Sequence, residues 1–123
     1  MIISIILLLT LAFAGCSNDP VTKVGNLVIV EDIQVQEGEY GDFYYTGKIE
    51  NKGNNTVYNA SIQFKIYETS AKETIIDNTW DYLADGENIA PGEQVYIETY
   101  KTDSVNNIEQ MNYYNHNIDW IER

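Results

Sequence analysis

The sequence predicts an all-β fold, and within that class an antiparallel β-sandwich of about seven strands. The first observation is the alternation of apolar and polar side chains over residues 58–68, which puts the two kinds on opposite faces of a strand. The apolar set is Ala60, Ile62, Phe64 and Ile66, and the polar set is Ser61, Gln63 and Lys65. The second is that turns rich in Gly, Asn and Pro separate further short apolar runs. The third is that no stretch after Cys16 keeps the helical period of 3.6, which favours a sandwich over an α/β layout.

Six segments have the composition and alternation of strands. They are residues 27–35, 43–50, 58–68, 74–82, 94–100 and 111–121. In the first of them, Val28 and Val30 interrupt the alternation, which indicates partial cover on that face or a β-bulge near Glu31. The fourth is ambiguous in register, because the adjacent Ile75 and Ile76 point to opposite faces.

The chain begins with an apolar run that ends at its only cysteine, Cys16. The run is shorter than the ~20 residues that cross a bilayer and has the length of a signal-peptide core. The sequence Phe13–Ala14–Gly15–Cys16 resembles a lipobox, the site where bacterial-type lipoprotein precursors are lipidated and cut. The resemblance implies a signal peptide over 1–15, a lipidated Cys16 with a short tether over 16–24, and a domain over 25–122. The alternative is an uncleaved membrane anchor followed by an ordinary cysteine.

Four short motifs occur in the order used by one known family. They are Gly47–Asn51, Phe64–Glu68, Ile89–Glu93 and Ile118–Trp120, with Phe64, Ile66, Tyr67, Glu68, Pro91 and Gly92 as the most characteristic positions. This series resembles the FxLYD domain, with Ile and Glu in place of the Leu and Asp that name it. The resemblance implies an immunoglobulin-like β-sandwich of the kind common in surface lipoproteins, with no general enzymatic role.

The net charge of the chain excludes some classes of binding partner from what we expect. The formal net charge is −12, and every charged residue lies at or after Asp19. Nucleic acids and anionic lipid surfaces are bound through Lys and Arg, so neither is an expected partner of this domain. The acidity indicates a soluble surface or, alternatively, attraction of a basic partner or of cations.

Two acidic turns are candidate cation ligands. Their members are Glu37, Glu39 and Asp42 in one turn and Asp81, Asp85 and Glu87 in the other. Calcium takes six to eight oxygen ligands, but neither turn has the spacing of an EF-hand. A metal- or solute-binding accessory lipoprotein is therefore kept as the alternative function, while no metal site and no cofactor is assigned.

His116 is the only histidine, and no catalytic set forms around it in the sequence. There is no Gly-x-Ser-x-Gly elbow, and the single cysteine lies at the membrane end of the chain. We expect a packed or edge imidazole, and no enzymatic activity.

Exposed tyrosines are the most suggestive surface feature. Tyr44, Tyr96, Tyr100 and Tyr113 are expected on outward positions. They could form cross-strand pairs that stabilise the sheet, or an aromatic patch for protein or glycan contact. Asn54, in the sequon Asn54–Asn55–Thr56, is a possible glycosylation site in a host that modifies secreted proteins.

Together these features predict a lipid-anchored protein on the extracytoplasmic face of the cell membrane. We expect a non-catalytic binding module, with envelope or extracellular proteins as partners.

Overall fold

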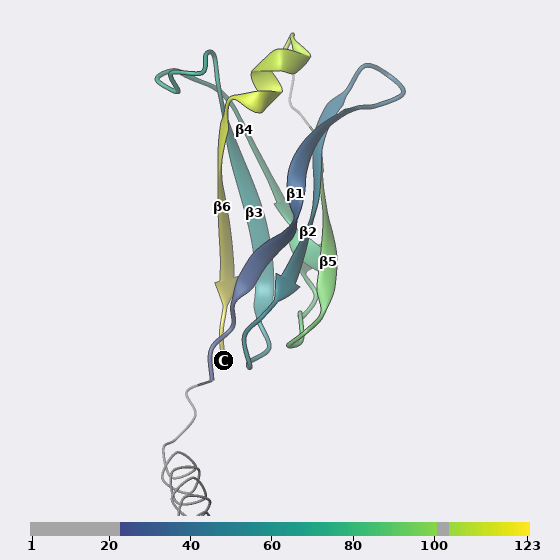
Figure 1. Ribbon diagram of the computed structural model, residues 1–123, viewed down its shortest axis with the longest axis vertical. Coiled ribbons are helices and arrows are strands. Elements are labelled where there is room, and N and C mark those ends of the chain that lie inside the picture. Colours follow the sequence, from purple (N-terminus) through teal and green to yellow (C-terminus); the bar gives the residue numbers. More distant parts are fainter. Residues whose placement is uncertain (1–22, 101–103) are drawn as a thin grey trace, which may run out of the picture.

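The structure is a computed structural model that describes residues 23–100 and 104–123. The predicted signal peptide, Cys16 and most of the tether lie outside the described residues. The described part is mostly β, which confirms the all-β prediction (Figure 1).

Two antiparallel three-stranded sheets face each other. The first sheet has the order β1 (Leu27–Glu37), β2 (Phe43–Asn51), β5 (Gln94–Tyr100), and the second has the order β4 (Ile75–Tyr82), β3 (Tyr58–Tyr67), β6 (Tyr114–Ile121). The described residues thus form six strands where about seven were predicted. Between β4 and β5 the chain makes a short 3-10 turn, η1 (Leu83–Gly86), and a single bridge from Ile89 to Val57. Pro91, which has no N–H, and Gly92, with φ of 83°, then turn the chain. The pairing of Ile89 with Val57 therefore remains a single bridge and does not become a strand.

The apolar side chains of β3 are buried, as their alternation with polar residues predicted. Ala60, Ile62, Phe64 and Ile66 are buried in the core that both sheets share. Because β3 is the central strand of its sheet, its outward residues are flanked on both sides, and Ser61 is buried between the positions of Tyr82 and Asp119.

Three aromatic rings join the sheets in the core. Tyr45 of β2 stacks on Phe64 of β3 with ring centroids 4.1 Å apart and planes at 16°. Tyr114 of β6 lies against both, at 5.0 Å from Tyr45 and 5.4 Å from Phe64. The Tyr45 hydroxyl donates a 2.6 Å hydrogen bond to the carbonyl oxygen of Met111, in the 3-10 turn η2 (Ile108–Asn112). This contact ties the connection before β6 to the opposite sheet. The last strand consequently begins at residue 114 rather than at 111, where the sequence placed it.

A second junction lies at the end of the domain near the C-terminus (Figure 1). The side chain of Asn51, at the end of β2, is fully buried and makes four hydrogen bonds. Its Oδ1 accepts from the backbone N–H groups of Asn26 and Gly53, and its Nδ2 donates to the carbonyl oxygens of Asn55 and Ile89. Three connections of the chain therefore meet on one amide.

The structure resolves the register of β4. Thr79 points inward and is buried, whereas Trp80 and Tyr82 point outward and are exposed. Ile76 falls at a register shift between β3 and β4, and this lets it pack against the core although it neighbours an exposed Ile75.

Candidate functional site: an acidic hollow beside Tyr96

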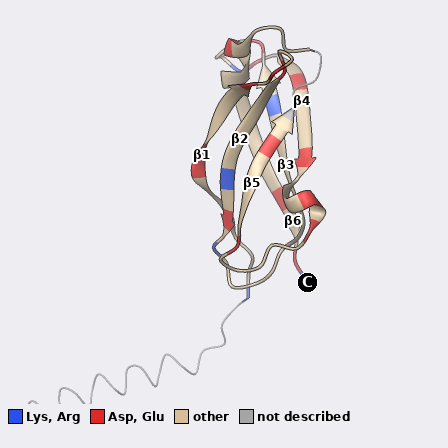
Figure 2. Ribbon diagram, turned by 90° about the vertical axis from the view of Figure 1, so that its right-hand side faces the viewer, with Lys and Arg blue, Asp and Glu red and all other residues tan. Residues whose placement is uncertain are grey.

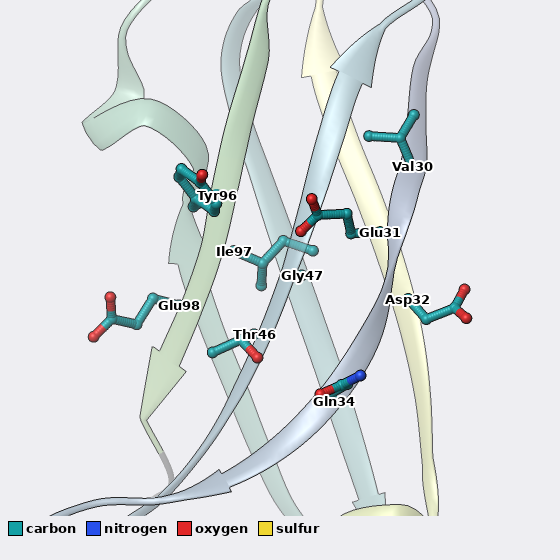
Figure 3. A pocket seen from close by; sticks show the side chains of 9 residues that line it. All are labelled: Val30, Glu31, Asp32, Gln34, Thr46, Gly47, Tyr96, Ile97 and Glu98. Carbon is teal, nitrogen blue, oxygen red and sulfur yellow. The ribbon is translucent and has the colours of Figure 1, made fainter.

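A large surface hollow lies where β1 departs from regular pairing with β2. The register shifts between Ile29 and Glu31 and again between Glu31 and Gln34, as the interrupted alternation of this strand predicted. The result is an open hollow of about 720 Å³ bordered by β1, β2 and β5 (Figure 3).

Gly47 of β2 favours the bulge. A Cβ atom at this position would lie 3.2 Å from the carbonyl oxygen of Glu31 and 3.3 Å from Cδ1 of Ile97. A side chain here would therefore push the backbone of β1 or the side chain of Ile97 away by a few tenths of an ångström.

Three acidic residues border the hollow, Glu31 and Asp32 on β1 and Glu98 on β5. In Figure 3 the Glu31 carboxylate points across the hollow, whereas those of Asp32 and Glu98 point away from it on opposite sides. Figure 2, which faces this sheet, shows acidic positions on β1 and β5 and a basic position on β2 between them. The borders of the hollow are therefore mainly acidic, on a protein that is acidic as a whole.

One cation is already built into this site. Lys48 Nζ lies 3.1 Å from Oε1 of Glu31 and 4.8 Å from the centroid of the Tyr96 ring. The hydrogen bond to Glu31 raises the pKa of Lys48. Tyr96 itself is 73% exposed, so most of its ring remains accessible to a second group. The hollow thus combines carboxylates with an aromatic face, the two kinds of group that bind ammonium and guanidinium ions.

The predicted surface tyrosines do not form one patch. Tyr96 borders the hollow, and Tyr44 is half-buried on the same sheet, in register with Gln36. The side chain of Tyr100 lies outside the described residues. Tyr113 lies at the opposite end of the domain from Asn51, after η2, where its hydroxyl donates a 3.3 Å hydrogen bond to Glu109.

The motif residues of the FxLYD resemblance have structural positions. Phe64 and Ile66 are in the core, and the Tyr67 hydroxyl accepts a 3.2 Å hydrogen bond from Nδ2 of Asn115. Glu68 is exposed and its N–H donates to the Thr74 carbonyl oxygen in the turn before β4.

The turn motif is tied directly to the strand motif. The exposed turn at Pro91 and Gly92 joins β2 through a 2.7 Å bond from the Gly92 N–H to the carbonyl oxygen of Asn51. Asn54, the possible glycosylation site, is exposed, and its Oδ1 accepts from the Val24 N–H at 2.8 Å.

His116 lies on β6, at the edge of its sheet. The imidazole is exposed, and its ring centroid is 6.2 Å from Phe64 and 6.3 Å from Tyr114. This fits the edge position that we expected for it.

The acidic turns are not assembled into a metal site in the described part of the chain. Over residues 23–100 and 104–123, no three His, Cys, Asp or Glu side chains are grouped so that they could hold a metal ion. No helix within those residues has the length and apolar character to cross a membrane.

Sequence reasoning missed two features. Trp80 and Tyr82 are exposed on β4. They lie two and four residues after the polar Asn78, and this spacing places all three side chains on one face of a strand. The sequence identified Asn51 only as the last residue of the Gly47–Asn51 motif, because nothing local distinguishes its buried amide from the exposed one of Asn54.

Comparison of the chain with protein-family models, with curated proteins and with solved structures found no match. The structure therefore defines the class by itself: an all-β domain of two antiparallel three-stranded sheets, with a surface hollow beside the exposed Tyr96.

Proposed function

We propose that this protein is a lipid-anchored binding module on the extracytoplasmic face of the cell membrane, without catalytic activity. Its domain would be an immunoglobulin-like sandwich of the FxLYD kind. The hollow beside Tyr96 would contact a basic segment of an envelope or extracellular protein. The observation that carries the proposal is the contact of Lys48 with both Glu31 and Tyr96, since it is an internal example of how a partner's cation would be held.

The sequence supports the anchor, and the structure supports display away from the membrane. Cys16 follows an apolar run of signal-peptide length. The first strand begins at the same end of the domain as the C-terminus, while the β1–β2 connection and η2 lie at the other end (Figure 1). A chain tethered at Cys16 would therefore present its outer sheet faces and far turns to the surroundings.

A basic segment of a partner would contact both the acidic residues of the hollow and the Tyr96 ring. A Lys or Arg side chain of the partner would enter the hollow near Glu31 and Tyr96, beside Lys48, while Asp32 and Glu98 add negative charge at its borders. The exposed Tyr96 ring would add an aromatic contact, which is a residue type enriched at interfaces. The acidity of the whole domain would raise the association rate, and added salt would lower it.

The anchor is tested on the protein isolated from its own membrane. Mass spectrometry of the mature N-terminus should find Cys16 as the first residue with an attached diacylglyceryl group. The Cys16→Ser variant should remain unmodified and leave the membrane fraction. An unmodified Cys16 in the wild-type protein would refute the anchor.

The hollow is tested by binding of a fluorescent oligolysine peptide to the full chain. Tyr96→Ala should weaken binding about tenfold, the effect of losing one interfacial hot-spot residue. The matched control is Tyr40→Ala, because Tyr40 is 87% exposed and lies in the turn between β1 and β2, away from the hollow. Equal affinities of the two variants would mean that only the overall acidity attracts the peptide.

A further inference from the structure

The outer face of the second sheet has a different chemistry from that of the hollow. Antiparallel register aligns outward residues of β4, β3 and β6 in rows, so that Trp80 lies opposite Gln63 and Gln63 opposite Asn117. The adjacent row contains Asn78 and Asn115, and Tyr82 follows Trp80 along β4. We call these six residues the amide–aromatic face: Gln63, Asn78, Trp80, Tyr82, Asn115 and Asn117.

The two aromatic rings of this face are presented to solvent. Trp80 is 53% exposed and Tyr82 is 49% exposed. Their ring centroids are 4.6 Å apart, with the ring planes inclined at 68°. They stand on the side of the sheet opposite to the core, so neither ring is needed to fill it. A large apolar surface left open at this position is informative because buried rings would be the favourable arrangement.

Amide side chains lie in the same rows as the rings. Gln63 Nε2 donates to Oδ1 of Asn78 at 3.1 Å, and Asn117 Nδ2 donates to Oδ2 of Asp119 at 2.9 Å. Asn115 accepts from Lys72 Nζ at 3.1 Å and donates to the Tyr67 hydroxyl. Beside these rows, β3 and β6 border a hollow of about 320 Å³ whose lining includes Gln63, Lys65, Asn115 and Asn117. Each amide has two N–H donors and a carbonyl oxygen with two lone pairs, so these bonds leave further donors and acceptors for a ligand.

This face carries few charges. Its rows include Lys65 and Asp119, and Lys72 reaches Asn115 from the turn before β4, in a protein whose formal net charge is −12. A basic peptide would favour the acidic hollow on the other sheet, and an anionic polymer would be repelled by the molecule as a whole. The face therefore suits an uncharged occupant.

We propose that the amide–aromatic face binds a neutral glycan chain. A pyranose ring has a face of C–H groups that packs on an aromatic ring, and hydroxyl groups around its rim that both donate and accept hydrogen bonds. Trp80 and Tyr82 supply the apolar platform, and the amides of Gln63, Asn115 and Asn117 supply donors and acceptors beside it. The site is separate from the hollow near Tyr96 and does not depend on the function proposed for that hollow.

A second copy of the chain is a poorer occupant on the same observations. Two molecules that each carry a net charge of −12 repel one another. Stable homodimers have interfaces that are more apolar than the rest of the surface, whereas this face is composed mainly of amides around two rings.

The test is affinity electrophoresis of the full chain in native gels. The gels contain hydroxyethyl cellulose, glycol chitin, a β-1,3-glucan or glucomannan as neutral probes, and polygalacturonate as the anionic one. The chain is solubilised in a detergent without a sugar headgroup, since an alkyl glycoside would compete for the site. At least one neutral glycan should retard the protein, and polygalacturonate should not.

Three variants locate the site. Trp80→Ala should lower the affinity about tenfold, as expected for a central aromatic contact, and Trp80→Phe should restore part of it. Tyr96→Ala, which removes an exposed ring from the other sheet, should leave retardation unchanged. Thermal unfolding of each variant shows that it is folded.

Three results would overturn the proposal. They are the absence of retardation by all four neutral glycans, equal weakening by Trp80→Ala and Tyr96→Ala, and a concentration-dependent dimer that Trp80→Ala abolishes. The last result would assign the face to contact between copies of the chain.

Discussion

The outer faces of the two sheets differ in chemistry although both are built on one core. On the first sheet, β1 bulges over Gly47 and opens a hollow bordered by Glu31, Asp32 and Glu98, in which Lys48 contacts Glu31. On the second sheet the pairing of β3 with its neighbours is regular over residues 61–66, and amides and aromatic rings line up across it. Outward positions are free of the packing constraints of the core, so the faces can diverge while the inner surfaces remain alike.

The comparison also shows what irregular pairing contributes. Where β1 keeps register with β2, the outer surface is a flat ladder of side chains. Where the register shifts, the strand separates from its partner and a hollow appears. The second sheet, with its bulges near the ends of β3, offers a flatter surface that suits a chain-like ligand lying across the strands.

The largest expected effect is that of Phe64→Ala, which removes the ring that the two sheets share. The change deletes the stack with Tyr45 and should lower the free energy of unfolding by about 3–5 kcal/mol, measured by urea titration. Binding at both outer faces should be lost in parallel as the protein unfolds. Trp80→Ala is the control, since an exposed substitution should change stability by only about 0.5 kcal/mol. Survival of one face without the other would show that the sheets fold independently.

Asn51→Ala is expected to have the next largest effect. It removes a hydrogen-bond partner from two backbone N–H groups and two carbonyl oxygens at a buried or partly buried position, and of these the Ile89 oxygen keeps its bond from the Val57 N–H. The expected loss is about 2–4 kcal/mol, since each buried polar group left unsatisfied is costly. Asn54→Ala, three residues along and exposed, should have a much smaller effect in the same thermal and urea unfolding assays. Comparable losses in the two variants would contradict the role that we give to Asn51.

Tyr45→Phe should have the smallest effect at neutral pH and a distinct one at alkaline pH. Loss of the hydrogen bond to Met111 should cost about 1 kcal/mol. Burial, together with the nearby Tyr114 and Asp77, raises the pKa of Tyr45 above the ordinary value of 10.0. Above about pH 10 the unfolded chain therefore releases a proton that the folded chain retains, so stability falls as the pH rises.

Tyr45→Phe has no hydroxyl to ionise at this position, so its free energy of unfolding should fall less steeply with pH than that of the wild type. The two slopes should differ by up to ~1.4 kcal/mol per pH unit. Urea titrations at a series of pH values measure both slopes. Because Tyr114, whose pKa is also raised by burial, is present in both proteins, the difference isolates Tyr45. Parallel slopes would mean that Tyr45 is ionised as readily in the folded state as in the unfolded chain.

Local patterns predicted the strands well and the surface sites in part. The alternation in β3 gave its buried face, and the outward position of Tyr96 followed from the alternation in β5. The register of β4 could not be predicted, because Ile75 and Ile76 are compatible with either register and only pairing with β3 decides between them. Trp80 and Tyr82 could not be recognised as exposed until that register was known.

The sequence by itself determined that the domain is β-rich and where each strand lies, because the alternation of side chains is a local property of the extended backbone. It also determined the net charge and the position of the single cysteine. Only the tertiary structure decided which carboxylates share a hollow, which rings face solvent, and that Asn51 joins three connections. The reason is physical: these contacts join residues 38 or 66 positions apart, as in Asn51 with Ile89 and Tyr45 with Met111, and such pairs meet only when the sheets close on a common core.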